Sequence, residues 1–255
     1  MELWKANYYN TTTVLSITSG TLTASYCRKR DETLQYISSG FNNDATTVSM
    51  VFTFDDTMNV SCIGLLETNF KNFRIFYNGS TSNTFALTSA ETSSSAWTGN
   101  TDVDKFLYCT TAAVSSITIE ATETMVANSE KAIGYVFISD VLVDFERVPS
   151  SKDYKPTKAV TDIVHKLSTG QTKVNFINEH WKVDISFKYI TTAFRNSLYE
   201  AFILKDEMGF VPFGTSTGWD GILFPCVWPG DFDFYKYSTD AVNSGFSGTI
   251  KLAEA

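Results

Sequence analysis

The stretch Val60–Tyr77, VSCIGLLETNFKNFRIFY, limits the fold of this chain more than any other part of the sequence. It consists of two apolar runs separated by a polar bend at Asn69. In the second run, Phe73, Ile75 and Tyr77 alternate with the residues between them, which is the period of a strand with one buried face. We therefore expect a strand, a bend and a second strand, a unit typical of binding and assembly sandwiches. The stretch holds no catalytic constellation.

Composition favours a mostly β protein. Apolar residues make up 43% of the 255 residues, which is enough for well-packed cores, and Ser and Thr are abundant. A chain of this length exceeds the usual size of one hydrophobic core. The predicted fold class is all-β, with an N-terminal jelly-roll β-sandwich and a smaller C-terminal β-sandwich that carries one α-helix.

The predicted domain boundary lies at residues 148–157, where apolar periodicity stops and two prolines, Pro149 and Pro156, occur. We expect the jelly roll over residues 1–147, a linker over 148–157 and the second β-sandwich over 158–255.

Three segments carry clear local patterns. Val48–Phe54 and Trp181–Tyr189 alternate apolar and polar residues and are predicted strands. Thr191–Asp206 has the helical period, with Thr191 or Thr192 as the N-cap and Gly209 as the residue that ends the helix.

The sequence does not support catalysis. His165 and His180 are the only candidates for a near-neutral base, and neither lies near a recognisable nucleophile motif. Carboxylates that are neighbours in a strand point to opposite faces and do not converge on a cleft by themselves. We predict a non-enzyme with no catalytic residue, no cofactor and no metal. A structural cation near Asp31 or residues 42–44 is the less favoured alternative.

The cysteines and the lack of a signal pattern predict a protein made in a cytoplasm. The four cysteines are scattered without paired spacing, which favours buried thiols over disulfides or zinc; they are Cys27, Cys62, Cys109 and Cys226. No apolar run is long enough for a membrane span and the N-terminus lacks a signal pattern, so we expect no membrane partner. The net charge of −8 disfavours a protein that grips nucleic acid.

Isolated aromatic residues supply the candidate contact sites. Trp97 stands in the polar loop Ser89–Asp104, where it either plugs the base of the sandwich or serves as a contact residue. Phe210, Phe213 and Trp219 belong to a glycine-rich stretch and are candidates for an interface with a neighbouring subunit, although core packing is the commoner fate of such residues.

The first part of the chain, from about Thr11 to Phe145, resembles the discoidin-like (galactose-binding-like) jelly roll. The resemblance rests on FDDTMNVSCIGLLETNFKNFRIFYN, which ends at Asn78, and on the closing strand IGYVFISDVL, Ile133–Leu142. Members of that family commonly bind carbohydrate through loops at one end of the barrel. Trp97 is the one loop residue that we nominate for such binding.

The combination with a following β domain that ends in FSGTIKL, Phe246–Leu252, resembles structural proteins of tailed bacteriophages. This resemblance implies a tail-tube-like second domain and a tube, distal-tail or baseplate subunit that forms a homo-oligomeric ring. The implied location is the virion tail, with other virion proteins as partners, and an acidic inner face would let DNA pass without sticking. A carbohydrate-binding module or receptor-binding adhesin, with a host-surface glycan as its partner, is the alternative.

Overall fold

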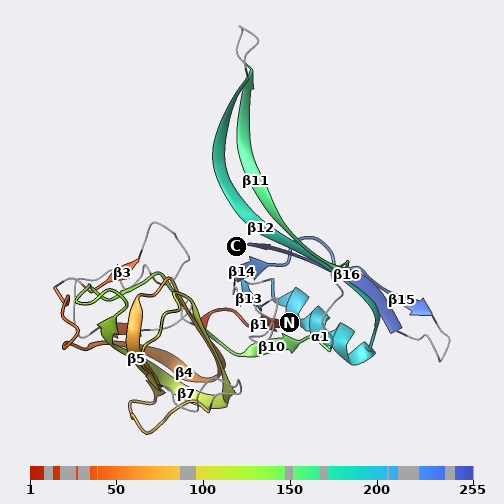
Figure 1. Ribbon diagram of the computed structural model, residues 1–255. Helices are drawn as coiled ribbons and strands as arrows, with labels where there is room; N and C mark the ends of the chain where they lie inside the picture. The colour runs from red at the N-terminus through yellow and green to blue at the C-terminus, as the bar shows by residue number, and fades with distance from the viewer. Residues whose placement is uncertain are drawn as a thin grey trace. The chain divides into compact units, whose positions relative to one another are not determined.

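The chain forms two compact units in the computed structural model (Figure 1). Unit 1 consists of Met1–Leu3, Leu142–Pro212 and Phe224–Ala255, and unit 2 is built from Trp4–Val141. Both units consist mainly of strands, which confirms the predicted all-β class. The structure describes residues 1–8, 14–17, 27, 35–38, 40–86, 96–146, 152–166, 172–205, 207–211, 224–238 and 245–254.

Unit 2 contains a six-stranded antiparallel sheet in the order β2-β4-β7-β5-β6, with β9 paired to β4, and a small two-stranded sheet of β3 and β8. The strands are β2 (Val14–Ile17), β3 (Tyr36–Ile37), β4 (Val48–Leu66), β5 (Phe70–Tyr77), β6 (Ala96–Trp97), β7 (Lys105–Thr124), β8 (Ala132–Ile133) and β9 (Tyr135–Ser139).

The long strands β4 and β7 join the two ends of this sheet. Their register shifts between Thr53 and Met58 and again between Val60 and Cys62. Before the shifts β4 pairs with β2, and after them it pairs with β9. The sequence predicts shorter strands here because a bulge interrupts the alternation of apolar residues without ending the strand.

The strand–bend–strand prediction for Val60–Tyr77 is confirmed, because β4 ends at Leu66 and β5 begins at Phe70. Asn69 fastens the bend to a neighbouring segment. Its Nδ2 donates to the carbonyl oxygen of Glu130 at 2.7 Å, and its Oδ1 accepts from the amide of Ala132 at 2.9 Å. One side chain thus satisfies two backbone groups, which explains why an amide stands between the apolar runs.

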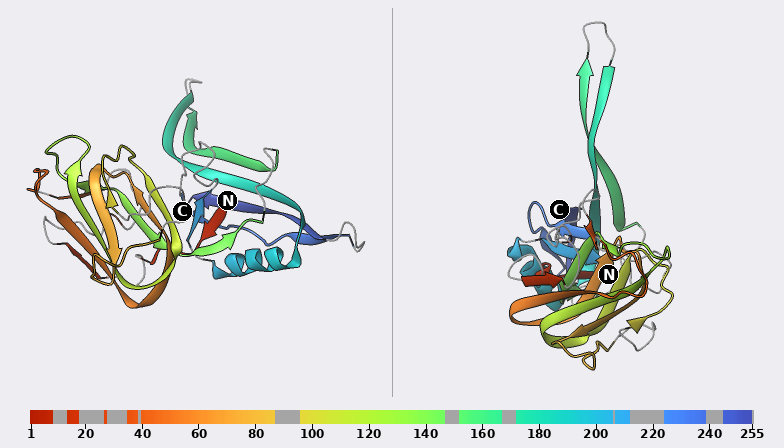
Figure 2. Two further views of the ribbon diagram at one scale, coloured as in Figure 1. Left: turned by 60° about the horizontal axis from the view of Figure 1, so that its bottom comes forward. Right: turned by 90° about the vertical axis from the view of Figure 1, so that its left-hand side faces the viewer.

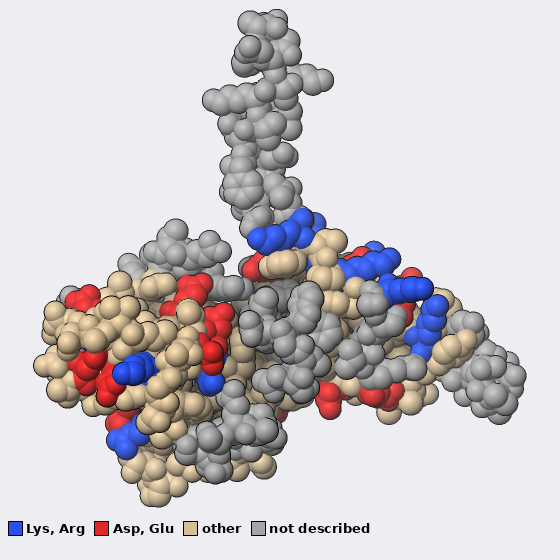
Figure 3. All heavy atoms as spheres, viewed as in Figure 1, with Lys and Arg blue, Asp and Glu red and all other residues tan. Residues whose placement is uncertain are grey.

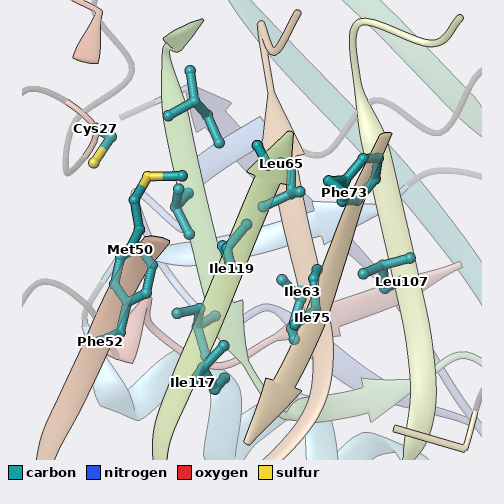
Figure 4. Packing of buried hydrophobic residues seen from close by; sticks show 14 of the residues in the cluster. Cys27, Met50, Phe52, Ile63, Leu65, Phe73, Ile75, Leu107, Ile117 and Ile119 are labelled. Atoms are coloured by element: carbon teal, nitrogen blue, oxygen red, sulfur yellow. The ribbon is translucent and has the colours of Figure 1, made fainter. Parts of the chain in front are cut away.

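The core of unit 2 lies under β4, β5 and β7 (Figure 4). Aliphatic side chains from these three strands meet there and are fully buried; they include Ile63, Leu65, Ile75, Ile117 and Ile119. Burial of apolar area from neighbouring strands is the main stabilising contribution to such a sheet.

Unit 1 contains an eight-stranded sheet in the order β10-β1-β13-β14-β16-β12-β11, with β15 paired to β16. The strands are β1 (Glu2–Trp4), β10 (Val141–Asp144), β11 (Tyr154–Lys166), β12 (Thr172–Ile190), β13 (Met208–Val211), β14 (Phe224–Val227), β15 (Phe234–Ser238) and β16 (Gly245–Glu254).

The helix α1 (Thr192–Leu204) packs against this sheet. The predicted N-cap is confirmed, because Oγ1 of Thr191 accepts from the amide of Phe194 at 3.1 Å. Phe194 and Leu198 are buried, and the Phe194 ring meets Phe187 of β12 edge-on with centroids 5.5 Å apart. The helix ends earlier than predicted, at Lys205 in the left-handed conformation, because that residue already breaks the helical hydrogen bonding.

Unit 2 is inserted between two strands of unit 1. Both β1, at the N-terminus, and β10 belong to the unit 1 sheet, so the units are not consecutive in sequence as residues 1–147 and 158–255 would be. Part of the predicted linker, residues 148–157, also belongs to β11. A three-residue strand such as β1 is too short to show a period, which is why the sequence pattern does not reveal it.

We expect the substitution Ile119→Ala to lower the free energy of unfolding of unit 2 by about 2–5 kcal/mol, because it leaves a cavity among fully buried side chains. The matched control is Thr111→Ala, on the same strand but exposed. Urea denaturation followed by tryptophan fluorescence measures both; equal stability of the two variants would contradict this account of the core.

Candidate functional site

β11 and β12 extend beyond the sheet to which they belong (Figures 1 and 2). They pair with each other from Tyr154 and Ile185 as far as Lys166 and Thr172. β16, however, pairs with β12 only from Lys182 onwards. Over Ala159–Lys166 and Thr172–His180, each strand is therefore paired only with the other among the described strands. We call this two-stranded segment the arm.

The arm presents backbone groups on both of its edges. Antiparallel pairing satisfies one side of each strand, and the amides and carbonyls of the other side face outward over the length of the arm. Its register shifts between Thr161 and Asp162, and such a bulge increases the local twist. Edges of this length that no further described strand covers are a template for another strand or for another chain.

The sequence predicts a strand over Val174–Ile177, which is part of the second strand of the arm, but it does not predict the first strand. The missed signal is the Thr169-Gly170 pair between two runs rich in β-branched residues, which is a hairpin pattern. The pattern is weak because charged residues interrupt both runs.

A groove with a volume of about 760 Å³ lies on the solvent face of the unit 1 sheet. It is next to the root of the arm, by which we mean the end where β11 and β12 join the sheet. Strand register places Lys155 opposite Asp184, and Asp184 opposite Lys251, so one row across three strands alternates in charge. In the next row, the hydroxyls of Ser186 and Thr249 are 3.0 Å apart. Figure 3 shows Lys and Arg side chains gathered over this part of unit 1.

The loop from Pro229 to Asp233, together with Tyr235 of β15, forms another wall of the groove. Two of its carboxylates, Asp231 and Asp233, add negative charge beside the lysines. Ser247 also lines the groove; it is 3% exposed, and its hydroxyl has no hydrogen-bond partner among the described residues. A buried hydroxyl without a partner indicates that something else supplies one.

Trp97 is a core residue. Its side chain is 8% exposed, and its ring stacks on Phe73 with centroids 4.8 Å apart. The sequence leaves open whether Trp97 packs inside the sandwich or serves as a contact residue. The structure shows that it packs inside, because β6 pairs with β5 and turns the indole inward. The ring is therefore not available as a surface for a sugar.

Of the three aromatic residues predicted at an interface, the structure describes one. Phe210 is fully buried in unit 1, where its ring lies 6.5 Å from that of Phe145, so it cannot anchor a neighbouring subunit. Phe213 and Trp219 lie outside the described residues. His180 is half-buried at the end of the arm, and the side chain of His165 is also outside the described part.

The ammonium group of a lysine from another segment lies against residues 42–44, where the sequence allows a cation. Lys131 is fully buried, and its Nζ donates to the carbonyl oxygens of Phe41 and Asn43 at 3.1 and 2.7 Å. Burial lowers the pKa of Lys131, whereas the nearby Asp44 carboxylate acts in the opposite direction. The other suggested position, Asp31, lies outside the described residues.

Asp44 is itself held by backbone donors. Its carboxylate accepts from the amides of Asn128 and Thr124 at 3.1 and 3.2 Å, and these bonds, with that from Asn128 first, lower the pKa of Asp44. The ammonium of Lys131 thus contributes to this loop the positive charge that a metal ion would otherwise supply.

All four cysteines are buried thiols, as predicted. Burial raises the pKa of Cys109 to about 12 and also raises that of Cys226, so neither thiol is activated. In the part of the chain that the structure describes, no three His, Cys, Asp or Glu side chains are placed to hold a metal. Within the same ranges, no helix has the length and apolar character needed to cross a bilayer.

Scans of protein families and of curated proteins found no match. Among solved structures, the chain is similar to CpGH89CBM32-6 of Clostridium perfringens, with 13% identity and a TM-score of 0.36 over 52% of this chain and 97% of that one. It is also similar to CpGH89CBM32-5 from Clostridium perfringens, in complex with GalNAc-β-1,3-galactose, with 8% identity and a TM-score of 0.41 over 52% and 99% of the two chains.

A third similar structure is chitosan-binding module 1 of a chitosanase/glucanase from Paenibacillus sp. IK-5. It shares 10% identity with this chain, with a TM-score of 0.39 over 53% of this chain and 98% of that module.

We expect Lys131→Met to destabilise unit 2 by about 1–3 kcal/mol for each carbonyl that loses its donor. The control is Lys71→Met, because Lys71 is 44% exposed in its ion pair with Glu123 and such pairs contribute about 0–1 kcal/mol. Urea midpoints measure both changes. A chelator should leave the wild-type midpoint unchanged, and a lysine variant as stable as the wild type would contradict the assigned role.

Proposed function

We propose that this chain is a non-enzymatic structural subunit that assembles with copies of itself into a ring. The arm is the observation that carries the proposal. An isolated two-stranded hairpin is marginally stable in water, and folded proteins normally cover or interrupt edges of this kind. An arm of this length is therefore best explained by a partner that covers it in the working assembly.

A second copy of the chain is the partner that fits a structural subunit. An arm that binds a different surface of the next copy makes a head-to-tail contact, and head-to-tail contacts close into rings when the rotation per subunit allows it. Unit 1 would build such a ring, since the arm belongs to its sheet. Unit 2, inserted between β1 and β10, would be carried by the ring and would contact a neighbouring protein.

In its most specific form, the proposal assigns the chain to the tail of a bacteriophage, as a tube, distal-tail or baseplate subunit. Other virion proteins would be its further partners, and the host cytoplasm would be the place where it is made. The net charge of −8 supports a subunit that does not bind passing DNA.

Removal of the arm tests the proposal. Lys158 of β11 pairs directly with Trp181 of β12. An Asn-Gly turn can therefore replace residues 159–180 without changing the pairing between residues 154–158 and 181–185. We expect the full chain to form a defined oligomer and the armless variant to stay monomeric with the same unfolding midpoint, as measured by sedimentation and urea denaturation. A full chain that stays monomeric at high concentration would overturn the proposal.

Glycan binding by unit 2 is the second candidate. It is supported by a small hollow of about 250 Å³ at the end of the loop that the sequence analysis singled out. Lys71, Asn100 and Thr101 supply polar groups there, and Met125 supplies an apolar surface. Small polar groups beside an apolar patch are the general composition of a ligand site.

A glycan array tests this second candidate. We expect Lys71→Ala to weaken binding of any captured glycan at least tenfold, because Lys71 lines the hollow. Arg74→Ala is the matched control, since Arg74 also forms an ion pair on β5, with Glu120, but lies outside the hollow. An array without any bound glycan would exclude the candidate, and equal losses in both variants would place the binding elsewhere.

A further inference from the structure

We propose that the groove of unit 1 receives the arm of the next copy, so that arm and groove are the two halves of the ring contact. The proposal rests on the proposed function and identifies the receiving surface.

The groove has mixed charge. Lys155 and Lys251 flank Asp184 in one row, and Asp231 and Asp233 line the opposite wall. A surface with cations and carboxylates side by side repels a polyanion in part and attracts it in part, so it does not suit nucleic acid. It suits a polypeptide that carries both signs of charge, because such a chain can place an opposite charge against each.

The arm is a polypeptide of that kind. Its sequence includes Lys166 and Lys173 as well as Asp162 and Glu179. Its backbone edges also offer both donors and acceptors along their whole length. The groove and the arm therefore have matching chemistry, and both belong to unit 1.

The hydroxyl of Ser247 also favours a polypeptide in the groove. It is nearly fully buried in the wall of the groove and lacks a partner among the described residues. An unsatisfied buried group costs about 1–3 kcal/mol. A neighbouring chain that shifts the side chains covering this hydroxyl would supply the missing donor or acceptor from its backbone edge, whereas a flat apolar partner would not.

A contact between arm and groove is asymmetric. The arm and the groove are different surfaces of one unit, so each copy can give its arm to one neighbour and receive an arm from another. A symmetric contact of arm with arm would stop at a dimer and would leave the groove open.

Two half-defective variants test the proposal by complementation. One copy lacks the arm, with Asn-Gly in place of residues 159–180, and keeps its groove. The other keeps its arm and carries Lys155→Glu and Lys251→Glu, which make the charged row entirely acidic. We expect each copy alone to be monomeric and an equimolar mixture to form a one-to-one complex, measured by mass photometry.

The matched control is Lys182→Glu with Lys236→Glu, which makes the same charge change on exposed residues of unit 1 outside the groove lining. This control should assemble like the wild type. Ser247→Ala is a milder test, and it should weaken assembly without lowering the stability of the free subunit, because no described residue binds that hydroxyl in the free subunit.

The outcomes separate the two proposals. If the charge-reversed copy assembles normally while the armless copy does not, the groove is not the receiving surface and the ring proposal stands. If both copies are monomeric but do not combine when mixed, the groove is again not the receiving surface and the ring proposal stands. If the armless copy assembles like the wild type, the ring proposal itself fails.

Discussion

Hydrogen bonds between Lys5 and Asp140 hold together the two ends of the segment that forms unit 2. They join the segment that leads into unit 2 to the segment that leads out of it: the amide of Lys5 donates to the carbonyl of Asp140 at 2.9 Å, and the two side chains form an ion pair at 2.8 Å. Asn7 reinforces the junction by donating to the carbonyl of Val136. An insertion is tolerated when its two ends lie close together, and this pairing holds them there.

Buried polar side chains play a second organising role in unit 2. Asn69 satisfies backbone groups of Glu130 and Ala132 where β8 begins, and Lys131 satisfies the carbonyls of Phe41 and Asn43. A buried backbone group without a hydrogen-bond partner raises the free energy of the folded state. Each of the two residues therefore favours the one backbone conformation in which its hydrogen bonds form. Both belong to the same region, because the groups that Asn69 binds lie in residues 130–132.

Local patterns in the sequence predicted much of the fold. The bend at Asn69, the strand Trp181–Tyr189 and the helix with its Thr191 cap all depend on periods and caps within a few residues, and the structure confirms them. The short strand β1 and the length of the arm were not predicted. A strand of three residues has no period. The arm differs from the other strands in that no further described strand pairs with its outer edges, and this is a property of pairing and not of sequence.

The candidate sites were harder to predict than the fold. The sequence predicts Trp97 and Phe210 as contact residues because aromatic residues in polar or glycine-rich stretches are common at binding surfaces. Both rings, however, are buried. The groove was missed because Lys155, Asp184 and Lys251 lie on three strands far apart in sequence and meet only through strand register.

The sequence by itself determined the all-β class, the bend, the helix and its cap, since these follow from residue periodicity and from hydrogen bonds between near neighbours. Only the tertiary structure decided that one unit is inserted in the other, that the arm extends beyond its sheet and that charges line a groove at its root. Those features depend on which strands of the sheet pair with one another. A local sequence pattern does not specify which distant strand a given strand will pair with.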